Sequence, residues 1–525
     1  MSTLTPKFDR KNGLSTPTGA INRDINEKLS EVFSPLDFGA VGDGTTNDTT
    51  AIQNAINALP TGGILDGLGL TYAVTACNLK SYMTLQNFSF FTIAGSTDFV
   101  SPVTIGAYGD TSTHSNINIY NVYIDGNRDN QTNIVYPSAE DGGRHGFRLI
   151  GNTNDILIKD CSANYCGTDG ISMYGGIGTN ASVLCFKNIT VENCTFEWNR
   201  RHGGSLESVK NVKFINCIFN NNGQTTVPGS ALTDGGHGAN TGTSALYGNG
   251  FDIECYGASG QSEDILFDGC FAKQNARAGI LCSDPSDPTS PIFFTNKNFS
   301  FRNCRLDKGT TTEIYSLLIT GNISTAALGN IYEGIYVSDC YIEDSVLFRS
   351  CDNVTMNGGL LVGGSTYCGV VEYATNVVLN TYTNNKLMLI STGANVAYTY
   401  VGDSQSYTAT LTPSASGSIT LYPEFNAVSY TISGKTISVQ GQVKVLSVSS
   451  PTGTSVLLLL PKTIPALSEA QGRFGGTIVS DANGLGYTAY PFYGLSGNGY
   501  ISIVMNANLF RPDDSIWFSF SYRFI

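Results

Sequence analysis

Six short segments in the middle of the chain share one alternation of apolar and polar positions. Each has an apolar residue, any residue, an apolar residue, any residue, then Asn, Asp or Gly, and finally Cys. Alternation with a period of two predicts a strand with one buried face. Asn, Asp or Gly favours the unusual backbone conformation of a corner. The segments are Ile156–Cys161, Ile189–Cys194, Val212–Cys217, Ile265–Cys270, Phe299–Cys304 and Ile335–Cys340.

A second repeated strand follows the first one and begins with glycine. Its clear members start at Gly146, Gly170, Gly203, Gly250 and Gly279, with weaker ones at 317–320 and 369–372. The shortest coil has about 23 residues, and an insertion of about 24 residues lies between Cys217 and Gly250. Short strands, fixed corners and loops of variable length predict a right-handed parallel β-helix, an all-β solenoid in which like residues stack in columns.

The sequence outside the repeat predicts a cap and a second domain. Residues 48–59 form an amphipathic helix with Asp48 at its start, and Pro60 ends it. This helix closes the open end of the solenoid. We therefore predict an N-terminal arm at 1–33, the β-helix at 34–400 and an antiparallel β-sandwich or jelly roll at 401–525. The last domain has no Cys and contains alternating strands such as 436–445.

Charge and cysteine usage narrow the classes of partner. The 525 residues carry 29 Lys and Arg against 42 Asp and Glu, a net charge of −13, which argues against nucleic acid or an anionic membrane as the main partner. No export signal or membrane-spanning run is present, and 456–460 is the longest aliphatic run. The 13 Cys read as free, buried residues without disulfides. Because no Cys-x-x-Cys pair occurs, the cysteines fit core packing better than metal binding. We predict no metal site and no cofactor.

The segment Ser34–Gln53, with the sequence SPLDFGAVGDGTTNDTTAIQ, resembles the start of pectate-lyase-like β-helix proteins. Together with the arm at 21–29 and the Cys-free end, the chain resembles a bacteriophage tailspike. The resemblance implies a homotrimer that binds, and usually cleaves, a bacterial capsule, exopolysaccharide or O-antigen. It also implies a virion protein made in the host cytoplasm without a signal peptide, whose N-terminal arm attaches to the phage tail or baseplate.

Two further elements are similar to the polygalacturonase branch of these proteins. Gly167-Thr-Asp-Gly-Ile is similar to that family's Asn-Thr-Asp-Gly element, and Arg201-His-Gly-Gly-Ser is similar to its Gly-His-Gly element. The paired aspartates that the family carries between these two elements are missing here. The elements therefore do not identify pectin as the substrate.

The second strand of each coil predicts where chemistry can occur. Side chains alternate between the two faces of a strand, so counting from the glycine shows which residues point outward. The outward columns bring together polar residues that are far apart in the chain. Glu207 and Glu254 belong to one column on consecutive coils, and Asp252 lies two residues before Glu254. The corner before the glycine holds His145, Asp169 and His202 in succession.

Glycoside hydrolysis requires two carboxyl groups, one as proton donor and one as nucleophile or base. Stacked strands place the roots of Glu207 and Glu254 about 5 Å apart, and like charges so close raise one pKa. We predict these two as the acid/base pair, with Asp252 and Asp169 as further catalytic candidates. Outward carboxylates are usually just solvated, and Asp169 also suits a purely structural corner. The predicted substrate-binding residues are His145, Arg148, Tyr174, Arg201, His202 and His237.

Two other classes of function remain open from the residues. A polysaccharide lyase needs a base such as His145, His202 or Tyr174, and a cation such as Arg148 or Arg201 to neutralise a uronate. A non-catalytic adhesin uses the same groove without turnover. Release of reducing ends separates an enzyme from an adhesin, and unsaturated products separate a lyase from a hydrolase.

Overall fold

The computed structural model describes most of the chain in ranges separated by gaps. It divides into two compact units, of which the first comprises residues 1–354, 369–375 and 390–394 and the second the remainder. The described ranges are 31–94, 101–107, 110, 112–131, 144–174, 186–224, 248–254, 262–284, 296–307, 309, 315–321, 332–363, 369–372, 374, 376–383, 388–390, 396–398, 405–423, 427–433, 436–459, 474–480, 488–494 and 500–523.

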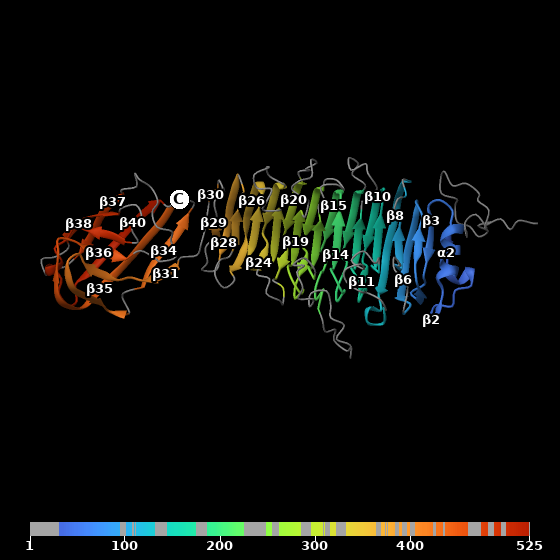
Figure 1. The fold of residues 1–525 in the computed structure, drawn as a ribbon, viewed down its shortest axis with the longest axis horizontal. Helices are drawn as coiled ribbons and strands as arrows, with labels where there is room; N and C mark the ends of the chain where they lie inside the picture. Colours follow the sequence, from blue (N-terminus) through green and yellow to red (C-terminus); the bar gives the residue numbers. More distant parts are fainter. Residues whose placement is uncertain are drawn as a thin grey trace, which may run out of the picture. The chain divides into compact units, whose positions relative to one another are not determined.

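The first unit is built from two stacks of parallel strands. Figure 1 shows the successive strands following one another from β3 to β24. Parallel pairing with short strands confirms the β-helix. The first stack contains β1 Val32–Phe33, β2 Asp43–Asn47, β3 Gly63–Asp66, β4 Thr71–Val74, β6 Met83–Thr92, β8 His114–Asp125, β10 Thr153–Lys159, β11 Ser162–Asn164, β13 Phe186–Glu192, β15 Val209–Ile215, β17 Glu263–Asp268, β18 Phe271–Ala272, β20 Asn296–Arg302, β21 Arg305–Leu306, β23 Tyr332–Ser338 and β24 Tyr341–Asp344.

The second stack carries the glycine-led strands of the repeat. The residues that follow the five clear glycines pair with one another in a single row across the stack, as the alignment predicts. They are Phe147, Ile171, Gly204, Phe251 and Ile280. The weak repeat member at 369–372 departs from the glycine alignment by one residue. Gly369 pairs with Val346 and so occupies the row that the residue after the glycine occupies in the other strands. The stack contains β5 Cys77–Leu79, β7 Val103–Ile105, β9 Phe147–Ile150, β12 Ile171–Tyr174, β14 Gly204–Glu207, β16 Phe251–Glu254, β19 Ile280–Asp284, β22 Leu317–Gly321, β25 Val346–Arg349 and β27 Gly369–Glu372.

The residue before each repeated Cys turns the chain in the left-handed region, as the pattern predicts. The φ angles at the six positions lie between 51° and 66°. Side chains at this corner join neighbouring coils: Asn193 Nδ2 donates to Asp160 Oδ1 over 3.0 Å, and Asn216 Nδ2 donates to Asn193 Oδ1 over 3.3 Å. The corner residue therefore supplies both the backbone conformation and the contact between coils.

The repeated Cys form a buried column without disulfides among the described cysteines. Their thiols donate to backbone carbonyls, as Cys161 Sγ does to Lys159 O over 3.1 Å. Burial raises the pKa of Cys77, a buried thiol on β5 of the other stack, to about 12, so this thiol stays protonated at neutral pH. The prediction of free, core-packed cysteines is confirmed for the part of the chain that the structure describes.

Helix α2, Thr49–Ala58, is the predicted cap and buries Ile52, Ala55 and Ile56. Asp48 stands at its N-cap position, but its carboxylate makes no capping hydrogen bond. The two Asp48 oxygens accept instead from Val41 N over 2.7 Å and Gly42 N over 3.0 Å. The aspartate thus fastens the preceding turn to the helix start. The 3-10 helices within the described ranges are η1 Pro35–Phe38, η2 Arg128–Asn130 and η6 Ala507–Leu509.

The second unit contains a largely antiparallel sheet, which confirms the predicted change of fold. The boundary at 400 stays a prediction. Parallel strands before it are β26 Cys351–Gly363, β28 Val377–Thr383, β29 Met388–Ile390 and β30 Val396–Tyr398. The antiparallel strands are β31 Gln405–Thr408, β32 Leu411–Pro413, β33 Ser416–Leu421, β34 Ala427–Ser433, β35 Thr436–Thr452, β36 Val456–Leu459, β37 Phe474–Ser480, β38 Thr488–Gly494, β39 Tyr500–Ile503 and β40 Ser515–Arg523.

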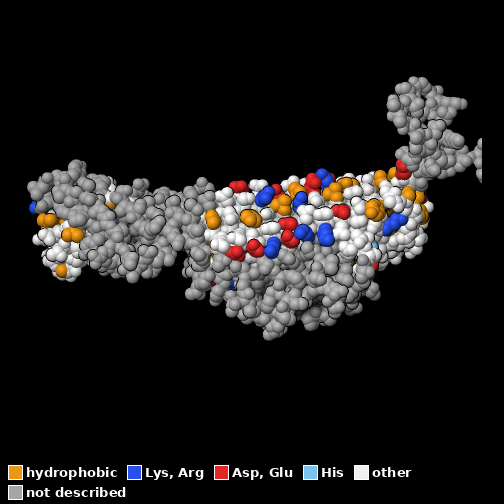
Figure 2. All heavy atoms as spheres, turned by 90° about the horizontal axis from the view of Figure 1, so that it is seen from above, with side chains coloured by type: hydrophobic (Ala, Val, Ile, Leu, Met, Phe, Trp, Pro, Cys, Tyr) orange, Lys and Arg blue, Asp and Glu red, His pale blue; other side chains and the backbone are white. Residues whose placement is uncertain are grey.

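Two aliphatic residues of the outward columns are buried in the structure. Counting from the glycines places Leu281 and Ile150 on the outward face of their strands, yet they are only 1% and 2% exposed. Outward charged side chains instead pair between coils, for example Lys210 with Glu263 at 2.8 Å. Figure 2 shows both charge signs intermixed on the face that it presents. Within the described ranges, no helix is long and apolar enough to cross a membrane.

Candidate active site

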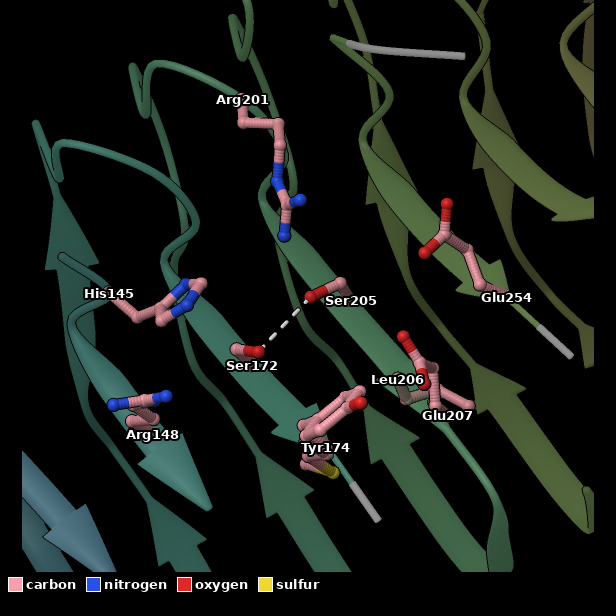
Figure 3. A pocket seen from close by; sticks show the side chains of 10 residues that line it. His145, Arg148, Ser172, Tyr174, Arg201, Ser205, Leu206, Glu207 and Glu254 are labelled. Carbon is pink, nitrogen blue, oxygen red and sulfur yellow. Dashed lines mark hydrogen bonds between the residues drawn. The ribbon is translucent and has the colours of Figure 1, made fainter. Parts of the chain in front are cut away.

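A pocket of about 290 Å³ opens over strands β9, β12, β14 and β16 of the second stack. Its walls combine acids, bases, hydroxyls and an aromatic ring, all projecting from neighbouring coils (Figure 3). The lining residues are His145, Arg148, Ser172, Met173, Tyr174, Arg201, Ser205, Leu206, Glu207 and Glu254.

The strand register explains why these residues meet. Tyr174 pairs with Glu207 between β12 and β14. Glu254 occupies the end of β16, the strand that pairs with β14. In Figure 3 the side chains of Tyr174, Glu207 and Glu254 come from three successive strands and border the same space. Both glutamates are partly exposed, although one carboxyl oxygen of Glu207, Oε2, is itself buried.

A second outward column forms the inner wall. Arg148, Ser172 and Ser205 are register partners on β9, β12 and β14. Ser205 Oγ lies 3.3 Å from Ser172 Oγ, the interaction dashed in Figure 3. Arg148 is partly exposed at one end of this column. The pocket thus has a cation at one end and two carboxyl groups at the other.

Asp169 lies fully buried behind this wall and holds Arg201. Arg201 Nε donates to Asp169 Oδ1 over 2.8 Å, and Nη2 donates to Oδ2 over 2.5 Å. His202 N adds a hydrogen bond of 3.0 Å and Ser205 Oγ one of 2.7 Å. Burial alone would raise the pKa of Asp169, but the Arg201 charge and hydrogen bonds hold this pKa well below its usual value.

His145 packs against the same carboxylate. Its Nδ1 lies 3.4 Å from Asp169 Oδ2 and 3.0 Å from Thr168 Oγ1. Burial lowers the pKa of His145, outweighing the Asp169 charge that raises it. The ring is therefore neutral at pH 7, and a neutral imidazole in a pocket can accept or relay a proton.

Asp252 and His202 make a second buried pair. His202 Nε2 lies 3.2 Å from Asp252 Oδ2, and both side chains are 2% exposed or less. Asn249 Nδ2 also donates to Oδ2, over 3.4 Å. Asp252 Oδ1 is buried and makes no hydrogen bond to any described residue. Burial raises the pKa of Asp252 well above the usual carboxyl range, and the neighbouring Glu254 charge raises it further.

The structure brings together most of the predicted site residues, at two depths. Glu207, Glu254, His145, Arg148, Tyr174 and Arg201 line the pocket. Asp252 belongs to an outward column, as the pattern predicts, but its side chain is only 1% exposed. Asp169 and His202 are equally buried, so these three residues support the wall rather than face the pocket. His237 lies outside the described residues.

Sequence reasoning missed the ion pair of Asp169 with Arg201 and the role of Ser205 in it. The sequence contained a signal for this ion pair. Asp169, just before Gly170, and Arg201, two residues before Gly203, lie near the same corner on consecutive coils. Among the residues that the structure describes, no group of three or more His, Cys, Asp or Glu side chains is arranged to hold a metal ion.

Comparison with known proteins relates the start of the chain to phage proteins. Residues 40–99 match the family described as the N terminal extension of bacteriophage endosialidase. The tail spike protein of an Escherichia phage is 51% identical over 59 residues, which cover 11% of this chain and 7% of that protein. These matches confirm the predicted resemblance to bacteriophage tailspikes.

Two carbohydrate-active enzymes are also similar. An exo-poly-alpha-D-galacturonosidase of Dickeya chrysanthemi is 40% identical over 85 residues, 16% of this chain and 13% of that enzyme. The mannuronan C5-epimerase AlgE5 of Azotobacter vinelandii is 28% identical over 268 residues, 42% of this chain and 25% of that enzyme. The chain thus spans a quarter or less of the length of each of these relatives.

Proposed function

We propose that this protein is a phage tailspike that binds a bacterial surface polysaccharide and depolymerises it by endo-hydrolysis of glycosidic bonds. The observation that carries the proposal is the placement of Glu207 and Glu254 on adjacent strands, both lining one pocket. Hydrolysis of a glycosidic bond requires just such a pair of carboxyl groups on either side of the bond. The similarity to phage tail proteins supports the biological setting.

In this mechanism one glutamate donates a proton to the leaving oxygen, and the other stabilises or attacks the sugar carbon. Adjacent parallel strands are about 4.8 Å apart, so the two carboxyl groups repel when both are ionised. Repulsion favours a state in which the pair keeps one proton at neutral pH. That state provides the acid and the base of the reaction at the same time.

The other pocket residues would bind the polymer. Arg148 offers two parallel hydrogen bonds to a sugar carboxylate, and this contact would offset the repulsion between an anionic polymer and a chain of charge −13. Tyr174 presents an aromatic face beside the glutamates, on which the apolar face of a sugar ring can pack. An acidic or amino-sugar-rich polysaccharide is therefore the proposed substrate class.

A lyase is the second candidate, because the same pocket holds a neutral His145 near Arg148. In β-elimination a base removes the proton next to a uronate carboxylate, and a cation stabilises the resulting charge. The similarity to an epimerase that acts on mannuronan supports this alternative. It predicts unsaturated products and a requirement for His145 rather than for both glutamates.

Glutamine variants of the two glutamates test the proposal. Glu207→Gln and Glu254→Gln keep the shape of the side chain and remove the titratable group. Each should lower the release of reducing ends from a susceptible capsule by at least about 100-fold. Polymer binding should remain, because the partly exposed side chains carry none of the core.

Glu263→Gln is the matched control, since Glu263 is also an outward glutamate of the solenoid but pairs with Lys210 on the other stack. This variant should keep wild-type turnover. If both pocket variants keep wild-type turnover, Glu207 and Glu254 are not the catalytic pair. If the wild-type protein binds the polymer without cleaving it, the protein is a non-catalytic adhesin.

A further inference from the structure

Among the described residues around Asp252, none offers an uncommitted cation to balance a negative charge. Its register neighbours are Ser205 on β14 and the buried Leu281 on β19. The positive charge that acts on it, the Arg201 guanidinium, makes paired hydrogen bonds to Asp169. On its own strand the neighbouring charge is that of Glu254, which disfavours a second carboxylate. A buried carboxylate in such a place costs far more free energy than a neutral acid does.

The hydrogen bonds of His202 show that this ring is neutral as well. The backbone N–H of Asn249 donates to His202 Nδ1 over 3.1 Å, so Nδ1 carries no proton. The ring proton must then be on Nε2, which faces Asp252 Oδ2 at 3.2 Å. Because Oδ2 accepts from His202 and from Asn249, a proton on Asp252 belongs on Oδ1, the oxygen for which the described residues offer no partner.

We propose that His202 and Asn249 hold Asp252 as a neutral carboxylic acid behind the pocket, and that its ionisation at alkaline pH switches the site off. The inference rests on the hydrolysis proposed above, in which neutral Asp252 takes no direct part. While it is neutral, the site contains the two glutamates alone. When it ionises, a further negative charge appears beside them, which raises the proton affinity of the glutamates and repels an anionic polymer.

Asp252→Asn tests this proposal because an asparagine reproduces the neutral acid. The amide oxygen can accept from His202 and Asn249, and the amide NH₂ occupies the position of the O–H group. The measurement is the unfolding equilibrium of the full-length wild type and variant between pH 5 and 9. The native state binds this proton more tightly than the unfolded state, so wild-type stability falls as pH rises above the ordinary carboxyl pKa.

The wild-type unfolding constant should therefore increase relative to that of Asp252→Asn by up to tenfold for each pH unit, until the native group ionises. A ratio independent of pH would overturn the proposal. An asparagine variant that fails to fold would also overturn it, since the substitution keeps the proposed hydrogen bonds. This readout does not depend on any enzymatic activity, so it stays valid if the proposed hydrolysis is wrong.

The second readout is the pH profile of kcat/KM on a susceptible capsule. The variant should keep wild-type activity at acid and neutral pH within about threefold and should lose the alkaline fall. An unchanged alkaline fall would show that another group sets it. Loss of activity at every pH would show that the ionised form of Asp252 is required, which contradicts the proposal.

Discussion

The ion pair between Asp169 and Arg201 should be a main source of local stability behind the pocket. Arg201→Met removes the charge partner and two of the four hydrogen bonds that the buried carboxylate accepts. Breaking a buried ion pair by removing one member costs about 3–5 kcal/mol, because the other charge stays buried without compensation. We expect Arg201→Met to lower the free energy of unfolding by about this amount at pH 7.

The loss should depend on pH with a definite sign. In the wild type the pKa of Asp169 is depressed, so its stabilisation is present above the unfolded carboxyl pKa and is lost as pH falls toward the folded value. In Arg201→Met burial dominates, and Asp169 is protonated more easily. The difference between the two proteins should therefore begin to narrow as pH falls through the raised Asp169 pKa of the variant, above the ordinary carboxyl value of about 4, and should keep narrowing below it.

The assay is urea unfolding followed by circular dichroism at several pH values. Lys210→Met is the control, because Lys210 and Glu263 are paired at 2.8 Å but their side chains are 39% and 24% exposed. Water screens such a pair, so the control should lose far less stability than Arg201→Met. Equal losses in both variants, or a difference between wild type and Arg201→Met that widens at low pH, would refute the reasoning.

Three further outcomes are expected. Arg148→Met should raise KM on an anionic polysaccharide at least about tenfold with little effect on kcat, and an equal effect on a neutral polymer would contradict the carboxylate contact. Reductant should leave the melting temperature unchanged, because the described cysteines are free and buried; a large drop would reveal disulfides. Light scattering should give about three times the chain mass of 55.9 kDa, and a monomer at micromolar concentration would exclude the homotrimer.

Much of the fold could be predicted because the solenoid repeats a physical requirement on every coil. The residue before each repeated Cys must adopt positive φ, so Asn, Asp and Gly recur there and reveal the corner. The Cys themselves must be small and apolar, which marks the buried column. The weak member at 369–372 was misaligned by one residue because its glycine is a strand residue that pairs with Val346.

The depth of each site residue could not be predicted in the same way. The alternation of side chains along a strand assigns Asp252 to the outward face, but this pattern does not show which residues cover that face. Asp252 is buried against His202, which is 50 residues earlier in the chain and belongs to the preceding coil. The same limit applies to Leu281 and Ile150, which the pattern places outward and the structure buries.

Mass spectrometry of the fragments released from a panel of bacterial capsules tests the proposed hydrolysis most directly. Hydrolysis adds one water to each broken bond, so every fragment should have the mass of a complete oligosaccharide repeat with a reducing end. Both Glu207→Gln and Glu254→Gln should release almost none. Fragments lighter by one water, with an unsaturated uronate at the new end, would contradict hydrolysis and establish the lyase that His145 and Arg148 support.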